Sequence, residues 1–154
     1  MTNFNPRGIF ENCSSLSQQV TMGVTRGMCK FAEMGYFSAN FTADVQCDVD
    51  FLAYHPETGA VEKVQVKTTT YKRKGNYIAA LKSGGYGKGN RKVAKDFTKL
   101  YVLDADGNDY IIDYDEIKNN TTQVTMKWEL TSLKTISKID MGSLFRYKLL
   151  NQKS

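Results

Sequence analysis

The sequence predicts an α/β chain of the α+β type, folded as one domain over residues 1–154. One segment has the apolar spacing of a helix, and two pairs of β-prone segments flank turn-forming residues. With 154 residues, 41% of them hydrophobic, the chain can bury a core without disulfide or metal staples. A folded globular protein is therefore expected, and the disordered and fibrous classes are excluded.

The first expected element is a helix over residues 16–34. Its apolar stripe is formed by residues at helical spacing, namely Val20, Val24, Met28, Phe31 and Ala32. Ser14 or Ser15 is available as the N-cap, and Gly35 suits the left-handed position that ends a helix. We therefore expect an amphipathic helix.

Strands follow the helix in an order that predicts hairpins. Residues 45–54 lead into the turn-forming run HPETG, and residues 61–70 then alternate between apolar and polar side chains. This pattern predicts a first hairpin. A short strand is expected over residues 76–81 (NYIAAL), and a second hairpin over residues 100–103 and 110–114, around DADGND.

Several kinds of site are not expected. The three cysteines lack CxxC spacing and His55 is the one histidine, so neither a zinc site nor a His-based nucleophilic centre is favoured. DADGND resembles a calcium loop, but its twelfth position is Asp115 in the next segment, which favours a hairpin turn.

The longest apolar run is a few residues and the N-terminus lacks signal-peptide features, so we expect no membrane span and a cytoplasmic location.

Positive charge is concentrated in one part of the chain. Residues 61–99 contain 11 basic and 2 acidic side chains, whereas residues 1–60 contain 3 and 6, and residues 100–154 contain 7 and 8. The net charge of +5 is thus an average that hides one strongly basic stretch. Lysine and arginine interleaved with aromatic residues are typical of a phosphate-binding surface. A solvated cationic face is the alternative that charge alone leaves open.

Chemically useful side chains fall at alternating positions of the first expected hairpin. Asp48 and Asp50 share one face of their strand, and Gln65 and Lys67 share one face of the next. Because Mg²⁺ prefers hard oxygen ligands, Asp50, the Gln65 side-chain oxygen and the Val66 carbonyl would form a partial metal shell. Lys67 would orient or deprotonate a water, or balance charge on the phosphorane of phosphodiester hydrolysis. On spacing alone, a solvated strand end beside an ordinary half-exposed strand remains the alternative.

A cationic run begins directly after this constellation and favours the catalytic interpretation. The run TTTYKRK would line a phosphate track beside the metal, and its candidate DNA-binding residues are Thr68, Lys72, Arg73 and Lys74. A Gly-rich basic loop over residues 83–95 follows. Its candidate contacts to the DNA backbone are Lys88, Arg91, Lys92 and Lys95.

These motifs resemble those of the PD-(D/E)XK nuclease superfamily. The similarity is carried by GMCKFAEMGY, by CDVDFLAYHPETGAVEKVQVKTTT, by the GNYIAAL strand and by DFTKLYVLDADGNDYIIDYDEI, over roughly residues 20–117. It is greatest with the branch of group I intron homing endonucleases in which the ExK motif reads QxK.

The resemblance implies a restriction-endonuclease-like core, with a mixed β-sheet flanked by helices and the active site on a β-hairpin. It also implies Mg²⁺- (or Mn²⁺-) dependent cleavage of double-stranded DNA by a homo-oligomer, a dimer or tetramer with one site per strand. The motif aspartate falls on Asp50, the variable Glu/Gln on Gln65 and the lysine on Lys67. Asp48 stays an alternate ligand. Many members place a glutamate near the start of the first helix, and here Glu11 is the upstream acid that we keep as a catalytic candidate.

Two other functions remain open on the same residues. A Holliday-junction resolvase or repair nuclease would use the same core on a different DNA structure. A non-catalytic DNA-binding module would need only the basic stretch and would bind DNA without cleaving it. The leading expectation is a site-specific, Mg²⁺-dependent, homing-type endonuclease of double-stranded DNA.

Overall fold

The computed structural model describes residues 7–40, 49–81, 96–119 and 123–127. Their helices and strands are, in chain order, η1 (Gly8–Phe10), α1 (Leu16–Glu33), β1 (Phe37–Asn40), β2 (Phe51–Tyr54), β3 (Val61–Thr69), β4 (Lys72–Arg73), β5 (Asn76–Ala80), β6 (Lys99–Asp104), β7 (Asp109–Asp113), α2 (Tyr114–Ile117) and β8 (Gln123–Thr125). No helix within these ranges is long and apolar enough to cross a membrane.

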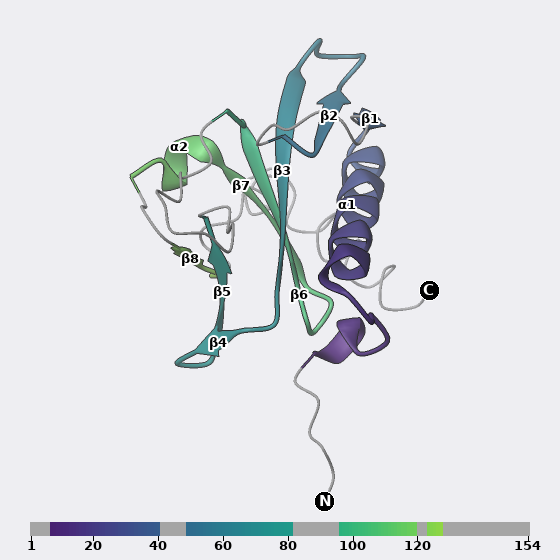
Figure 1. Cartoon of the computed structure of the whole chain (residues 1–154). Helices are drawn as coiled ribbons and strands as arrows, with labels where there is room; N and C mark the ends of the chain where they lie inside the picture. Colours follow the sequence, from purple (N-terminus) through teal and green to yellow (C-terminus); the bar gives the residue numbers. More distant parts are fainter. Residues whose placement is uncertain (1–6, 41–48, 82–95, 120–122, 128–154) are drawn as a thin grey trace, which may run out of the picture.

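A five-stranded sheet forms the centre of the molecule, in the order β1-β2-β3-β6-β7. β1, β2 and β3 pair antiparallel, β3 pairs parallel with β6, and β7 returns antiparallel to β6. A smaller sheet has the order β4-β5-β8 (Figure 1). The predicted α+β class and mixed sheet are therefore confirmed.

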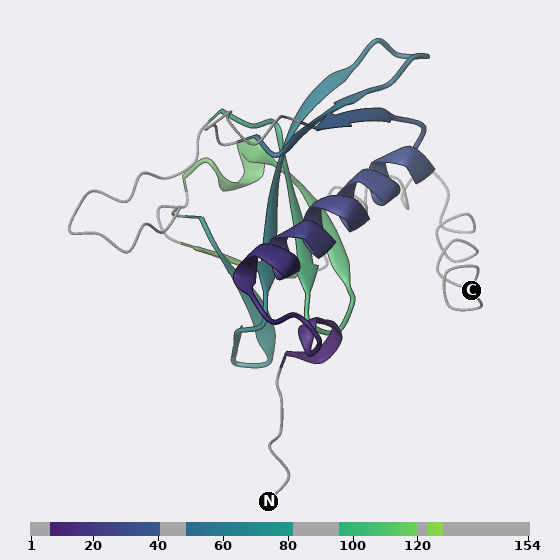
Figure 2. The same cartoon turned by 45° about the vertical axis from the view of Figure 1, so that its right-hand side comes forward.

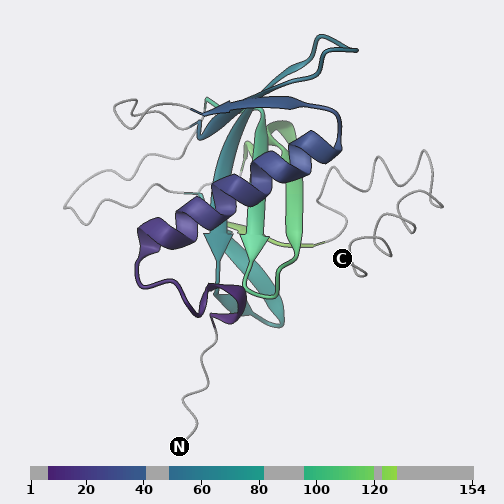
Figure 3. The same ribbon diagram turned by 90° about the vertical axis from the view of Figure 1, so that its right-hand side faces the viewer.

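Different elements cover the two faces of the central sheet. α1 lies on one side, and β5, β8 and α2 lie on the other (Figure 1). Figures 2 and 3 show α1 running obliquely across its face of the sheet. Val66 and Thr68 face α1, because their side chains are the nearest neighbours of Gly23. Since side chains alternate along a strand, Gln65 and Lys67 face the opposite side.

α1 confirms the predicted helix and part of its predicted stripe, because Phe31 is buried and Val24 and Met28 pack against the core. Ser15 Oγ accepts a hydrogen bond from Gln18 N at 3.2 Å, and Gly35 follows the helix with a φ of +94°, so both ends are as expected. Val20 is 42% exposed and Ala32 is also exposed, so their assignment to the stripe is wrong. The buried positions are spaced four residues apart and are Gln19, Gly23, Gly27 and Phe31.

Close packing of α1 on the sheet explains this difference. A Cβ atom on Gly23 would lie 2.6 Å from Thr68 Cγ2, and one on Gly27 would lie 3.0 Å from Tyr101 Cδ1. These separations are shorter than ordinary van der Waals contact, so a larger residue would push the helix away. The helix therefore turns its glycines, and not Val20, toward the sheet.

The remaining predicted strands agree with the structure in type and order. The first hairpin is β2–β3, the NYIAAL strand is β5, and the second hairpin is β6–β7. Residues 45–48 of the first predicted strand lie outside the described residues. The DADGND run is a hairpin turn, in which Asp104 Oδ1 accepts hydrogen bonds from the backbone N–H groups of Asp106 and Asn108, each at 2.9 Å.

Candidate active site

Asp50 lies directly before β2 and extends its pairing with β3. The Asp50 N–H donates to the Val64 carbonyl at 2.8 Å, and Asp50 Oδ2 accepts from the Val66 N–H at 2.6 Å. The carboxylate thus takes the position in the ladder that a backbone carbonyl of β2 would otherwise occupy. This contact fixes the charge of Asp50 against the middle of β3.

Gln65 holds a buried side-chain oxygen that lacks a hydrogen-bond donor. The residue is 9% exposed, and its Oε1 is one of two buried side-chain polar atoms without a partner in the described part of the chain. Leaving such an acceptor unsatisfied costs about 1–3 kcal/mol, and a water or an ion is the usual explanation. Gln65 Oε1 is therefore the atom at this site where a bound water or ion is most expected.

The β2–β3 pairing brings three predicted site residues to one part of β3. The Asp50 carboxylate bonds to the N–H of Val66, the residue between Gln65 and Lys67. Gln65 and Lys67 alternate with Val66, so they share the face of β3 that lies away from α1. Lys67 is half-buried there. The Asp50 carboxylate thus lies beside Gln65 and Lys67 along the strand.

The oxygens at this face suit a small, hard cation. Asp50 provides a carboxylate and Gln65 a carboxamide oxygen, and the Val66 carbonyl projects to the same edge of β3 as its N–H. Mg²⁺ and Mn²⁺ take oxygen ligands, and Mg²⁺ keeps several of its waters. No group of three or more His, Cys, Asp or Glu among the described residues is placed to hold a metal ion. An ion here would rest on one described carboxylate, neutral oxygens and the oxygens of a bound phosphate.

The structure does not bring Glu11 to the same place. Glu11 is exposed and follows η1, whose backbone is bonded to the Ala105 carbonyl at the β6–β7 turn. Ala105 lies four residues beyond Tyr101, the β6 partner of Val66. That is a distance of about 13 Å along the strand. The other candidate acid, Asp48, lies outside the described residues, so catalytic roles for both stay predictions.

The predicted cationic track is described in part. Lys72, Arg73 and Lys74 are exposed on the β4–β5 hairpin, just beyond the end of β3. Thr68 instead faces α1, and its Oγ1 accepts a hydrogen bond from Gln19 Nε2 at 2.8 Å. The candidate residues that lie outside the described ranges are Lys88, Arg91, Lys92 and Lys95.

Gln19 packs on the face of β3 opposite Gln65 and Lys67, and the sequence pattern did not reveal its burial. It is 8% exposed on α1, and its contact with Thr68 ties the helix to β3 next to Lys67. A signal was present in the sequence, because Gln19 lies four and eight residues before Gly23 and Gly27. A polar residue aligned with two helical glycines indicates a face that packs closely on another element.

Burial raises the pKa of two ionisable groups at the neighbouring β6–β7 hairpin, the Asp104 carboxyl and the Tyr110 hydroxyl. Asp104 is fully buried, and this burial raises the pKa of its carboxyl group. Tyr110 OH donates to Asp104 Oδ2 at 3.3 Å. Burial, and secondarily the charge of Asp104, raises the pKa of Tyr110 to about 12. Since Asp104 also accepts from the turn, its contacts are those of a structural support for the hairpin.

Similarity to known proteins is found at the level of the fold. No protein-family model matches the sequence, and no curated protein matches it. Among solved structures, the chain is similar to the bacterial homing endonuclease I-Ssp6803I, with a TM-score of 0.63 and 17% sequence identity. The match covers 74% of this chain and 79% of that chain. At this identity the likeness establishes a shared fold, so any conclusion about chemistry must come from the site residues.

Proposed function

We propose that this chain is a site-specific, homing-type endonuclease that hydrolyses double-stranded DNA with Mg²⁺ or Mn²⁺. The observation that carries the proposal is the buried Gln65 Oε1, which no described donor satisfies, on the face of β3 that also holds Lys67 and beside the Asp50 carboxylate at the Val66 N–H. The fold shared with a homing endonuclease supports DNA as the substrate.

Each residue of this face would have a separate task. The Val66 N–H holds the Asp50 carboxylate in a fixed orientation. Gln65 presents a neutral oxygen, which adds a ligand without repelling the phosphate. The Lys67 ammonium would orient the attacking water or neutralise charge that develops on the phosphate. A bound Mg²⁺ would polarise the phosphate and lower the pKa of a coordinated water.

Loss of charge at Asp50 or Lys67 should remove cleavage and leave DNA binding intact. We expect Asp50→Asn and Lys67→Ala to lower the cleavage rate by at least about 100-fold, because each acts on charge that develops in the transition state. Plasmids with randomised inserts would be incubated with the protein and Mg²⁺, and the cut ends sequenced to recover a target. Rates would then be measured on that target, with binding measured separately by gel shift.

Two substitutions on α1 provide matched controls for this experiment. Glu33→Gln removes an acid and Arg26→Ala removes a cation, both from exposed positions on the opposite side of the sheet (Figure 1). Both variants should cut like the wild type. Equal cutting by wild type, Asp50→Asn and Lys67→Ala would contradict the proposed site.

A DNA-binding module without nuclease activity is the second candidate. It is favoured by the absence, within the described residues, of a metal-binding group with three acids, histidines or cysteines. This function predicts salt-dependent DNA binding and no cleavage with any divalent metal. A resolvase or repair nuclease would instead cleave, with a preference for four-way junctions or damaged DNA over linear duplex in a competition assay.

We also propose that the chain acts as a homo-oligomer. The two strands of a duplex present two scissile phosphates of opposite polarity, whereas the described residues form one candidate site. A dimer or tetramer would supply one site to each strand, and two-fold symmetry would match the symmetry of the DNA backbone. Sedimentation of the free protein and of its DNA complex would measure the number of chains.

A further inference from the structure

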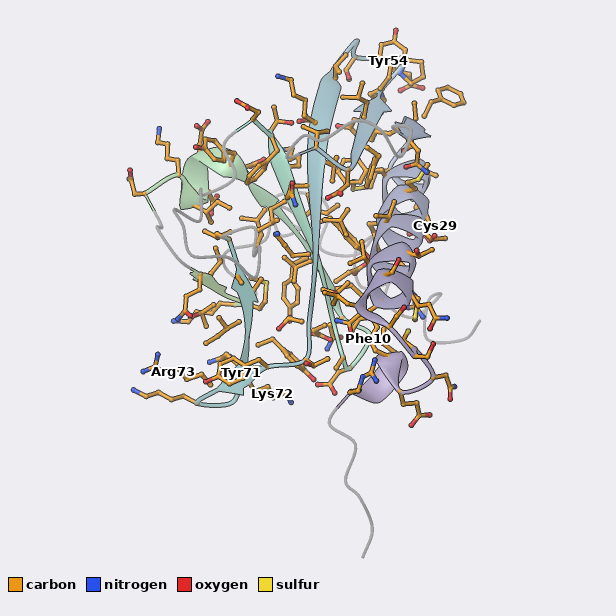
Figure 4. The ribbon with its side chains drawn as sticks, in the orientation of Figure 1. Phe10, Cys29, Tyr54, Tyr71, Lys72 and Arg73 are labelled. Carbon is orange, nitrogen blue, oxygen red and sulfur yellow. The ribbon has the colours of Figure 1, made fainter. Side chains whose placement is uncertain are left out.

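The β4–β5 hairpin follows β3 directly and projects at the lower left of Figure 4. Its two-residue turn consists of Lys74 and Gly75, with φ angles of 52° and 82°. Positive φ at both central residues is the geometry of a type I′ turn, which normally has Asn-Gly at these positions. The hairpin is thus a narrow, tightly closed ribbon with a lysine at its tip.

Lys74 is an unusual residue for this turn. Within the described ranges it is the one residue other than glycine with a positive φ. The left-handed region crowds a Cβ atom, and Asn or Gly would adopt it with less strain. Strained residues of this kind cluster at functional sites. The strain at the tip motivates the hypothesis that Lys74 has a function.

The inward face of the ribbon is attached to the body of the molecule. Lys72 Nζ lies 3.3 Å from Asp106 Oδ2 and 4.7 Å from the centre of the Tyr77 ring. The hydrogen bond and charge of Asp106 raise the pKa of Lys72. Tyr77 is buried against the core. Lys72 is thereby engaged in holding the ribbon against the β6–β7 turn.

The outward face of the ribbon carries polar side chains. Because Lys72 pairs with the inward-facing Tyr77, the next pair, Arg73 and Asn76, faces outward. Tyr71 precedes Lys72 and is 61% exposed (Figure 4). Arg73 and Asn76 are exposed as well. This face therefore combines a guanidinium, a carboxamide and a phenol.

Building on the proposed nuclease function, we propose that this outward face reads base edges in the DNA major groove. A two-stranded β-ribbon fits this groove, and arginine and asparagine form paired hydrogen bonds with guanine and adenine, respectively. Arg73 and Asn76 are the base-reading residues, Tyr71 packs beside them, and Lys74 binds a phosphate at the tip. Lys72 is a positioning residue that fixes the ribbon through Asp106.

The length of chain between Lys67 and the ribbon limits where the bases lie. Arg73 follows Lys67 by six residues, which span about 20 Å at most in extended chain. Asn76 is its partner across the hairpin. Base pairs are spaced by about 3.4 Å along the duplex, so this distance is about six base pairs. We therefore expect the bases read by Arg73 and Asn76 within about six base pairs of the cut.

The test is a binding selection from a pool of random DNA duplexes. All proteins carry Asp50→Asn so that no DNA is cut, and Arg73→Ala and Asn76→Ala are compared with this parent. Each variant should lose about 10-fold or more of base discrimination at one or two neighbouring positions, with the other positions unchanged. Arg26→Ala, on α1, is the matched control and should keep every base preference of the parent.

Three results would overturn base reading by the ribbon. The first is that both variants keep the base preferences of the parent. The second is that the variants bind all DNA more weakly but keep the same base preferences. The third is that the parent protein selects no sequence from the pool. The selection does not depend on cleavage, so a wild type that binds selectively but never cuts would contradict the proposed catalysis and leave this inference standing.

The tip and the inward face are tested by separate substitutions. Lys74→Asn should raise the melting temperature by about 2–4 °C, because the strain is relieved. The same change should flatten the slope of log affinity against log salt by about one unit, because a phosphate contact is lost. Lys72→Met should weaken base discrimination at the positions that Arg73 and Asn76 read, without changing the slope of log affinity against log salt. A lower melting temperature for Lys74→Asn would contradict the strain at the turn, and an unchanged salt slope would contradict its phosphate contact. Base preferences that stay intact in Lys72→Met would contradict the positioning role of Lys72.

Discussion

Gln65 keeps a buried carboxamide oxygen that no described donor satisfies. Its partner across the ladder, Leu100 of β6, is a fully buried hydrophobic residue. An apolar side chain would therefore suit the position at least as well for folding, since the unsatisfied oxygen costs about 1–3 kcal/mol. A ligand for that oxygen accounts for a glutamine here, and a divalent ion beside Asp50 is the ligand that the local charge favours.

Gln65→Leu should separate folding from metal binding. Without metal, we expect its free energy of unfolding to match or exceed that of the wild type by up to about 1 kcal/mol, because the unsatisfied oxygen is gone. We also expect Mg²⁺ to stop raising its melting temperature, because an ion stabilises only the state that binds it. Thermal denaturation in EDTA and in Mg²⁺ measures both effects.

Gln65→Glu is the companion variant for this measurement. It should be less stable than the wild type in EDTA, because it buries a second carboxylate near Asp50, and more strongly stabilised by Mg²⁺. An unchanged Mg²⁺ response in Gln65→Leu would show that the carboxamide oxygen is not a ligand.

At the scale of the element, α1 shows how a helix can be predicted correctly and its buried face only in part. The cap at Ser15 and the stop at Gly35 are local features, so the sequence contains them directly. The orientation is decided by contacts of Gly23 and Gly27 with strands that lie far away in the sequence. Hydrophobic periodicity favours Val20, because a glycine adds nothing to an apolar pattern.

Gly23→Ala should destabilise the fold although alanine favours helices. The added Cβ would meet Thr68 Cγ2 at 2.6 Å, and overpacking of this kind typically costs about 1–3 kcal/mol. The gain in helix propensity, about 1 kcal/mol, offsets part of this. Urea denaturation would measure the net loss, with Thr25→Ala at an exposed position of α1 as the control, expected within about 0.5 kcal/mol of wild type. A Gly23→Ala protein more stable than wild type would show that α1 is free to shift.

The β2–β3 hairpin was more predictable than its surroundings for a physical reason. Alternation along a strand is a local rule, so Gln65 and Lys67 could be assigned to one face of β3 from spacing alone. The engagement of Lys72 by Asp106 could not be foreseen, because it joins two hairpins that are distant in sequence.

At the scale of the whole molecule, the central sheet separates two surfaces. α1 lies on one, and β5, β8 and α2 lie on the side of the other, which carries Gln65 and Lys67, with the β4–β5 hairpin beyond the end of β3 (Figure 1). The basic residues 61–99 include β3 and this hairpin, so the strongest positive charge in the sequence accompanies the candidate site. DNA is therefore expected to approach from the side away from α1.

An oligomer with one site per strand makes a prediction about mixed assemblies. Wild-type and Asp50→Asn chains with different affinity tags would be coexpressed, and assemblies that hold both tags purified. These should nick a target plasmid and accumulate the nicked circle, because one of the two strands meets a site without its carboxylate. Assemblies of two differently tagged wild-type chains, purified the same way, should give linear DNA directly. If the mixed assembly linearises the plasmid as fast as the wild type, each chain must be able to cut both strands in turn, and the two-site arrangement would be wrong.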